Sequence, residues 1–134
     1  MIEKEFVNYN QALALKELGL DEPCLATYHK ELHTIIPLYG YYTNQDVIKA
    51  PLKQQVFRWF REKYKYHIVI TNTNGLGKSK GFGYEISIQN SNDVIAEYGS
   101  IYVPDEPWLN TYEEAEDACI DKLIEIVKGD KNEK

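Results

Sequence analysis

The fold is decided by the seven-residue stretch Phe82-Gly83-Tyr84-Glu85-Ile86-Ser87-Ile88, in which apolar and polar side chains alternate. Successive side chains of a β-strand point to opposite faces, so this pattern predicts a strand with one buried face and one wet face. A second alternating stretch runs from Tyr66 to Thr71, upstream of a glycine-containing segment. The two stretches together predict an antiparallel hairpin, because antiparallel sheets commonly expose one face to water.

The clearest helix lies near the end of the chain. Thr111 and Glu114 have the spacing of a capping box, in which each side chain bonds to the other residue's backbone. Apolar residues then recur three and four positions apart, and Gly129 follows as a natural stop. We therefore predict a helix over residues 112–128.

Two further helices are predicted upstream. Asn8 and Gln11 have the spacing of a helix start, and Gly19 has the character of a left-handed helix end. A middle helix begins at Ala50-Pro51, because proline is well tolerated in a first turn. One face of that middle helix is apolar, and basic residues are spaced along the opposite face.

The remaining apolar stretches complete the fold class. Residues 24–29 and 32–38 predict a second hairpin, and one more strand is expected within residues 95–103. The sequence thus predicts an α+β fold of order α-β-β-α-β-β-(β)-α, with an antiparallel sheet of four to five strands packed against helices. We expect a single domain over residues 1–129 and a frayed polar tail over residues 130–134.

Composition excludes several classes of protein. The chain has 134 residues, and its 15 Lys and Arg against 21 Asp and Glu give a net charge of −6, which argues against a nucleic-acid coat protein. No apolar run approaches the roughly 18 residues that a membrane span needs, and the polar, acidic start is unlike a secretory leader. Only two cysteines are present, far apart, so we expect no disulfide and a reducing, cytoplasmic location.

Residues typical of catalytic or metal sites are few. Cys24, His29 and His33 lie near one another in sequence, but no second cluster completes a zinc-binding set. His67 has no serine or cysteine nucleophile in a recognisable local signature. We therefore expect no metal, no cofactor and no enzymatic activity.

A short segment, Gly77-Lys78-Ser79, is similar to the end of a phosphate-binding loop. The complete pattern needs a glycine at position 72, where Asn72 stands, and it needs a helix to follow. Here the chain continues into the predicted strand instead. A hairpin tip is the better interpretation of this segment.

A second segment, Lys80-Gly81-Phe82-Gly83-Tyr84, is similar to the aromatic strand with which RNA-recognition domains stack on bases. If Phe82 and Tyr84 faced RNA, Glu85 would point into the core, which costs several kcal/mol unless the carboxylate is paired or neutralised. We therefore predict that both aromatic side chains belong to the core, on the same face as Ile86 and Ile88.

Charge is distributed unevenly along the chain. Residues 49–81 hold eight basic residues and one acidic residue, a net of +7, which leaves −13 for the rest of the chain. Two parts of this basic segment are expected at the surface: one face of the middle helix, which is rigid, and the tip of the hairpin that follows it. The candidate binding residues are Arg58, Arg61 and Lys65 on the helix and Lys78 and Lys80 at the hairpin tip. Such a surface attracts an anionic partner. The alternative is that these charges only solvate the helix or are neutralised within the fold.

Tyrosine is unusually frequent, with 11 residues in the chain. Three of them, Tyr39, Tyr41 and Tyr42, cluster before the middle helix. Exposed tyrosine together with arginine is typical of protein interfaces, so we add these three to the candidate binding residues. The alternative is that they line the wet rim of the core.

Three sequence blocks carry a resemblance to known proteins: residues 15–24, residues 50–64 with the run Val56-Phe57-Arg58-Trp59-Phe60, and residues 111–125. Together they resemble a group of small uncharacterised proteins encoded by phages and integrated elements of Bacteroides-type gut bacteria. The resemblance implies a cytoplasmic role in such a host, and it implies no particular reaction or catalytic residue.

Two hypotheses of function follow. The first is a non-enzymatic accessory protein that binds a partner protein through the basic helix face and the tyrosine-rich loop. The second is binding of nucleic acid or an anionic nucleotide by the same basic surface, and the sequence leaves self-association open. Neither hypothesis involves a membrane.

Overall fold

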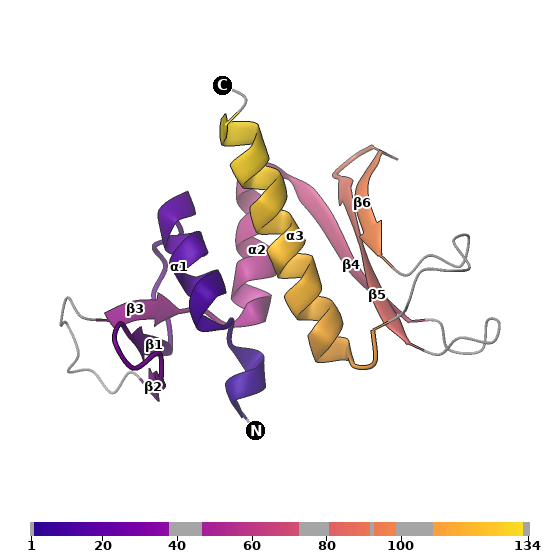
Figure 1. Ribbon diagram of the computed structural model, residues 1–134. Helices are drawn as coiled ribbons and strands as arrows, with labels where there is room; N and C mark the ends of the chain where they lie inside the picture. Colours follow the sequence, from indigo (N-terminus) through magenta and orange to yellow (C-terminus); the bar gives the residue numbers. More distant parts are fainter. Residues whose placement is uncertain (1, 38–46, 73–80, 92, 99–108, 133–134) are drawn as a thin grey trace. The chain divides into compact units, whose positions relative to one another are not determined.

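The computed structural model describes residues 2–37, 47–72, 81–91, 93–98 and 109–132. Contacts divide the chain into two compact units, residues 1–56 with 124–134, and residues 57–123. The described residues form three α-helices and two three-stranded antiparallel sheets, which makes the fold α+β, as predicted (Figure 1).

The first unit begins with a 3-10 turn, Ile2–Glu5, and helix α1, Tyr9–Leu18. The predicted capping box is present: the Gln11 amide donates to the Asn8 side chain at 2.8 Å, and the Asn8 amide donates to the Gln11 side chain at 3.0 Å. Gly19 adopts a left-handed conformation with φ of 101°. Its amide and that of Leu20 bond back into the last turn, so both predicted ends of this helix are confirmed.

The sheet of the first unit has strand β1, Ala26–His29, between β2, Ile35–Pro37, and β3, Val47–Ala50. Ala26 pairs with Pro37 on one side and with Ala50 on the other. Phe6 packs with Ala26 and Ala50 as a small buried cluster. The Tyr28 hydroxyl donates to the Val7 carbonyl at 2.6 Å, which ties this sheet to the segment before α1.

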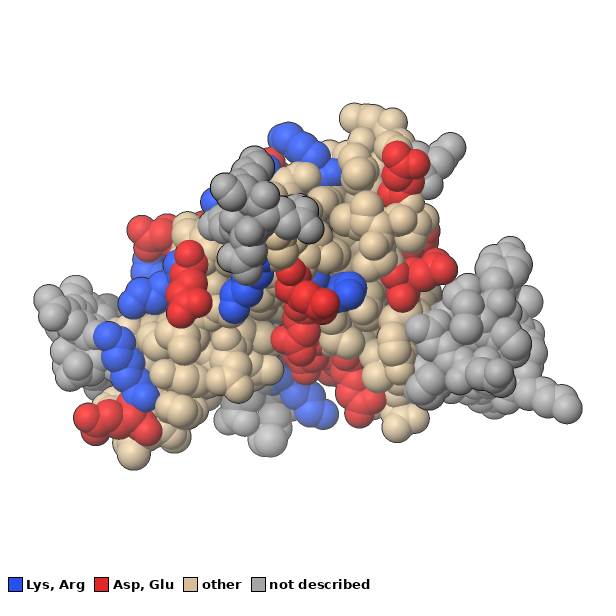
Figure 2. All heavy atoms as spheres, turned by 45° about the horizontal axis from the view of Figure 1, so that its top comes forward, with Lys and Arg blue, Asp and Glu red and all other residues tan. Residues whose placement is uncertain are grey.

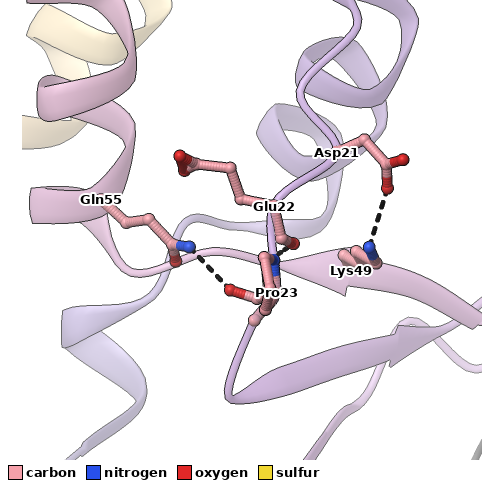
Figure 3. A network of polar contacts seen from close by, with 6 residues as sticks. Asp21, Glu22, Pro23, Lys49 and Gln55 are labelled. Atoms are coloured by element: carbon pink, nitrogen blue, oxygen red, sulfur yellow. Dashed lines mark hydrogen bonds and ion pairs between the residues drawn. The ribbon is translucent and has the colours of Figure 1, made fainter.

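Polar contacts hold the loop between α1 and β1 in place (Figure 3). The Lys49 ammonium on β3 meets the Asp21 carboxylate at 2.8 Å. The Gln55 side-chain amide donates to the Pro23 carbonyl at 2.8 Å, while its oxygen accepts from the Leu52 amide at 3.3 Å. The Gln55 side chain therefore serves both the loop and the start of the following helix.

The second unit contains the hairpin that the alternating stretches predict. Strand β5, Phe82–Ile88, lies between β4, Tyr66–Asn72, and β6, Val94–Tyr98. Tyr84 and Ile86 are only 7% and 0% exposed, so the core position predicted for them is confirmed. Phe82 is half-buried, and on the opposite face Gly83 is buried while Glu85 and Ser87 are half-buried, so the two faces differ less than predicted. Ile88 differs, because it is 40% exposed at the end of its strand.

Two long helices contribute residues to both units. Helix α2 spans Lys53–Tyr64 and buries Val56, Phe57, Trp59 and Phe60. Helix α3 spans Tyr112–Asn132, so it continues through Gly129, where the sequence predicted its end and a frayed tail. At its start the Glu114 amide donates to the Thr111 hydroxyl as predicted, but the Glu114 carboxylate accepts from the Asn110 amide instead of Thr111.

The sheet arrangement differs from the predicted one. The described strands form two sheets of three, where the sequence suggested one sheet of four to five. Strand β3 was not predicted, because four residues are too few to show a clear alternation of apolar and polar side chains. These residues form a strand through their pairing with β1. The last predicted strand, 95–103, is seen as Val94–Tyr98, and its remaining positions lie outside the described residues.

Candidate binding surface at the end of helix α2

Within residues 49–72, the described part of the basic segment, four of the six basic side chains have interactions within the protein. Lys49 is paired with Asp21, and the hydrogen bond and charge of that lysine lower the pKa of the Asp21 carboxyl. Lys53 is only 4% exposed, and it has a partner in the protein, as does Arg58. The Lys63 ammonium lies 4.9 Å from the centre of the Trp59 ring, a cation–π contact. The net charge of +7 therefore overstates how much of this segment is available to a partner.

Arg61 and Lys65 are the two cations at the end of α2 that are exposed, as predicted, and for which the described residues show no ion pair or cation–π contact. Both are exposed, one turn apart at the C-terminal end of α2. Among the described residues, no carboxylate lies within ion-pair distance of either side chain. Arg58 is exposed on the same helix but is engaged, so it is a secondary member of the predicted set.

Lys65 has an unusual backbone conformation. Its φ is +61°, the left-handed region that a residue just after a helix commonly adopts and that glycine normally fills. A side chain in this conformation costs about 1 kcal/mol relative to the right-handed one. The chain therefore keeps a lysine where glycine would fit more easily.

Gln89, in the turn after β5, holds this helix end. Its backbone amide donates to the Lys65 carbonyl at 2.9 Å. Its side-chain amide donates to the carbonyls of Tyr66 at 3.1 Å and Arg61 at 3.4 Å. Of these three carbonyls, that of Arg61 lies in the last turn of α2, where it also accepts from the Lys65 amide, and that of Tyr66 begins β4. Gln89 therefore ties the end of α2 and the start of β4 to the turn after β5.

An open groove of about 420 Å³ lies beside this helix end, lined by His67, Ser87, Ile88, Gln89, Asn90 and Ser91. His67 on β4 stands directly opposite Ser87 on β5. Asn90 has a left-handed φ of 64°, and the Ser91 hydroxyl accepts from the Asp93 amide at 3.1 Å. The lining offers hydroxyl, amide and imidazole groups, with exposed Ile88 as its apolar part.

The other predicted binding residues lie outside the described residues. Tyr39, Tyr41 and Tyr42 fall within 38–46, and Lys78 and Lys80 fall within 73–80. Of the eight predicted residues, the described part of the chain thus places Arg58, Arg61 and Lys65, and it brings them onto one helix and its end.

On the face drawn in Figure 2, blue Lys and Arg side chains and red Asp and Glu side chains are interspersed among tan ones. This pattern agrees with the pairing seen for individual residues, such as Lys49 with Asp21. At the end of α2, the feature to explain is the pair of exposed cations, Arg61 and Lys65.

Both cysteines and two of the three histidines, His29 and His33, have structural surroundings. Burial raises the pKa of Cys24 to about 11 and that of Cys119 to about 12, so both thiols are poor nucleophiles at neutral pH. The His29 ring nitrogen Nδ1 accepts from the amides of Glu31 and Leu32, and His33 stacks on Tyr9 with 3.7 Å between ring centres. Within the described ranges, no three potential ligands gather as a metal site would require.

Comparisons with protein-family models, with curated proteins and with solved structures find no match. Across the part of the chain that the structure describes, no helix is both long enough and apolar enough to cross a membrane.

Sequence reasoning missed the groove and the role of Gln89. The residues that line the groove come from two parts of the sequence, position 67 and positions 87–91, and strand pairing brings these parts together. One signal was present in the sequence: Lys65 stands between a helix and a strand with no glycine to end the helix. A helix end without glycine calls for a capping side chain from elsewhere.

Proposed function

We propose that this protein acts by binding a partner protein, without catalysis, through a surface centred on Arg61 and Lys65. The observation that carries the proposal is the pair of exposed cations at the end of α2, with no described carboxylate in ion-pair range. Charged groups left unpaired at a surface steer and orient a complementary partner. The tyrosine-rich segment of residues 39–42, which lies outside the described residues, is proposed as a second contact because of its composition.

The setting is proposed from the resemblance to phage and mobile-element proteins of Bacteroides-type bacteria. In that setting the chain is an accessory protein of the host cytoplasm, and its partner is a host or phage protein. The buried, weakly acidic thiols support a role that does not use cysteine chemistry.

Nucleic acid is the weaker candidate. A protein that holds a phosphate backbone typically neutralises several phosphates, on the order of 6–10 in well-studied cases. Most basic residues of the described helix segment are engaged within the fold, and the chain carries a net charge of −6. Two cations suit a short acidic segment of a protein better than a polyanion.

Affinity capture with charge-reversed variants tests the proposal. The immobilised wild type, R61E/K65E and the control K16E/K30E are incubated with lysate of a Bacteroides-type host carrying a related element. Lys16 and Lys30 are exposed and lie away from the end of α2 in the sequence, so the control has the same total charge as the test variant. We expect the same protein from the wild type and the control and its loss with R61E/K65E; equal recovery by all three contradicts the proposal.

A further inference from the structure

We infer that the groove beside α2 receives an acidic, extended segment of the partner, with one carboxylate seated among the polar groups of His67, Ser87 and Asn90. This inference rests on the proposed function and adds the chemistry of the partner to it. The volume of the groove, about 420 Å³, lies in the range of ligand-binding pockets, roughly 300–1,000 Å³.

The position of the groove relative to the two cations supports this assignment. Gln89, which forms part of the groove, bonds through its backbone to Lys65 and through its side chain to the Arg61 carbonyl. The two cations are therefore rooted next to the groove, within one hydrogen bond of its lining. Arg61 and Lys65 carry long, flexible side chains, so an acidic segment lying in the groove is within reach of cations that start from these two backbone positions.

The polar and apolar groups of the lining are complementary to a peptide that carries both acidic and apolar side chains. Ser87 and Asn90 carry hydroxyl and amide donors that a carboxylate accepts from, and charge-assisted bonds of this kind are stronger than neutral ones. Ile88, 40% exposed, gives an apolar contact next to those donors. Alternating acidic and apolar side chains on an extended segment would meet both.

Two carboxylates near the groove should weaken the binding of an acidic segment, whereas Arg61 and Lys65 should strengthen it. Asp93 is exposed in the same turn as Ser91, and Glu62 is exposed on the last turn of α2. Neither forms an ion pair with Arg61 or Lys65 among the described residues. Both would repel an acidic segment, so neutralising Asp93 should strengthen binding. Its backbone bonds to Ser91 and Ile88 would remain.

Fluorescence anisotropy with a defined peptide tests the inference. The probe is a labelled nine-residue peptide of Asp, Glu and Leu, and the comparison peptide has Asn and Gln in place of the acids. We expect the acidic probe to bind the full chain and the amide probe to bind at least tenfold more weakly. Binding should also fall as salt rises, because exposed charges are screened.

Variants of the groove locate the binding. R61Q and K65Q should each weaken the acidic probe by up to about fivefold, the upper end for one exposed ion pair. N90G keeps a left-handed backbone and removes the side chain, so it should also weaken binding, while D93N should strengthen it about twofold. K30Q, a matched neutralisation elsewhere, should change nothing. Amide NMR shifts on peptide addition should centre on residues 87–91.

Several outcomes overturn the inference. One is equal binding of the acidic and amide probes. Another is tighter binding of a 12-nucleotide single-stranded DNA than of the acidic peptide under the same conditions. A third is loss of partner capture by R61E/K65E with no effect of N90G or D93N on peptide binding and no shifts at residues 87–91. That third result leaves the proposed function standing and removes only the acidic groove.

Discussion

The backbone amide of Gln89 donates to the carbonyl of Lys65 at 2.9 Å, so the turn after β5 is bonded to the residue that follows helix α2. This single relationship joins the two cations to the groove, because the Gln89 side chain also reaches the Arg61 and Tyr66 carbonyls. The arrangement of the candidate surface therefore depends on the folding of the second unit. The contribution of the Gln89 bonds to folding can be measured separately from binding.

Replacing Gln89 by alanine should destabilise the protein. The variant loses the side-chain bonds to the Arg61 carbonyl of α2 and the Tyr66 carbonyl of β4, and a typical lost hydrogen bond costs about 1 kcal/mol. Q89E should lose at least as much, because an ionised carboxylate cannot donate to a carbonyl. Urea unfolding monitored by circular dichroism measures both. A Q89A midpoint equal to that of the wild type would show that these bonds do not hold the helix end.

Lys65→Gly should separate folding from binding. Glycine adopts the left-handed conformation without strain, so the free energy of unfolding should rise by about 0.5–1 kcal/mol. Binding of the acidic peptide should weaken at the same time, because the cation is gone. Thermal unfolding and anisotropy on the same sample check the two effects. A loss of stability in this variant would mean that the lysine side chain is structural.

A pair of glycine substitutions tests the β5–β6 pairing and the extension of α3 through Gly129. A Cβ on Gly83 would lie 2.1 Å from the Tyr98 carbonyl oxygen, so G83A should destabilise the protein by about 2–3 kcal/mol. A Cβ on Gly129 would meet nothing within 4 Å, and alanine is the better helix former. G129A should therefore stabilise α3 by about 0.5–1 kcal/mol. Similar effects of the two substitutions would contradict the β5–β6 pairing or the extension of α3.

Both thiols should resist alkylation in the folded protein. With pKa values of about 11 and 12, about 0.1% of Cys24 and about 0.01% of Cys119 would be ionised at pH 8, against roughly a quarter of a free thiol. Iodoacetamide labelling followed by mass spectrometry should show slow reaction that rises with pH above 9. In urea, both should react at the rate of free cysteine. Fast labelling of Cys24 at pH 8 would place it in a different environment.

The sequence predicted those parts of the fold whose signals are local. The capping residues around Asn8 and Thr111 fixed helix starts, and Gly19 fixed a helix end, because capping bonds span only a few residues. The alternation from Phe82 to Ile88 predicted the strand and the burial of Tyr84 and Ile86 at its centre. These features needed no knowledge of distant parts of the chain.

The parts that could not be predicted depend on contacts between distant residues. Strand β3 exists through pairing with β1, and the division into two sheets depends on which strands become neighbours. The basic segment was correctly seen as positive, but the pairing of Lys49 with Asp21, 28 residues away, is a tertiary contact. The groove is of the same kind, since strand register brings His67 opposite Ser87.

Site-specific photo-crosslinking tests the central claim most directly. A benzoyl-phenylalanine is placed at Glu62, exposed beside Arg61 on α2, and in a second protein at Leu32, 70% exposed in the first hairpin. Irradiation in the host lysate should attach one partner protein through position 62, with none through position 32, and an added R61E/K65E change should abolish the adduct. An adduct from position 32 with none from position 62, or one that survives R61E/K65E, would contradict the account.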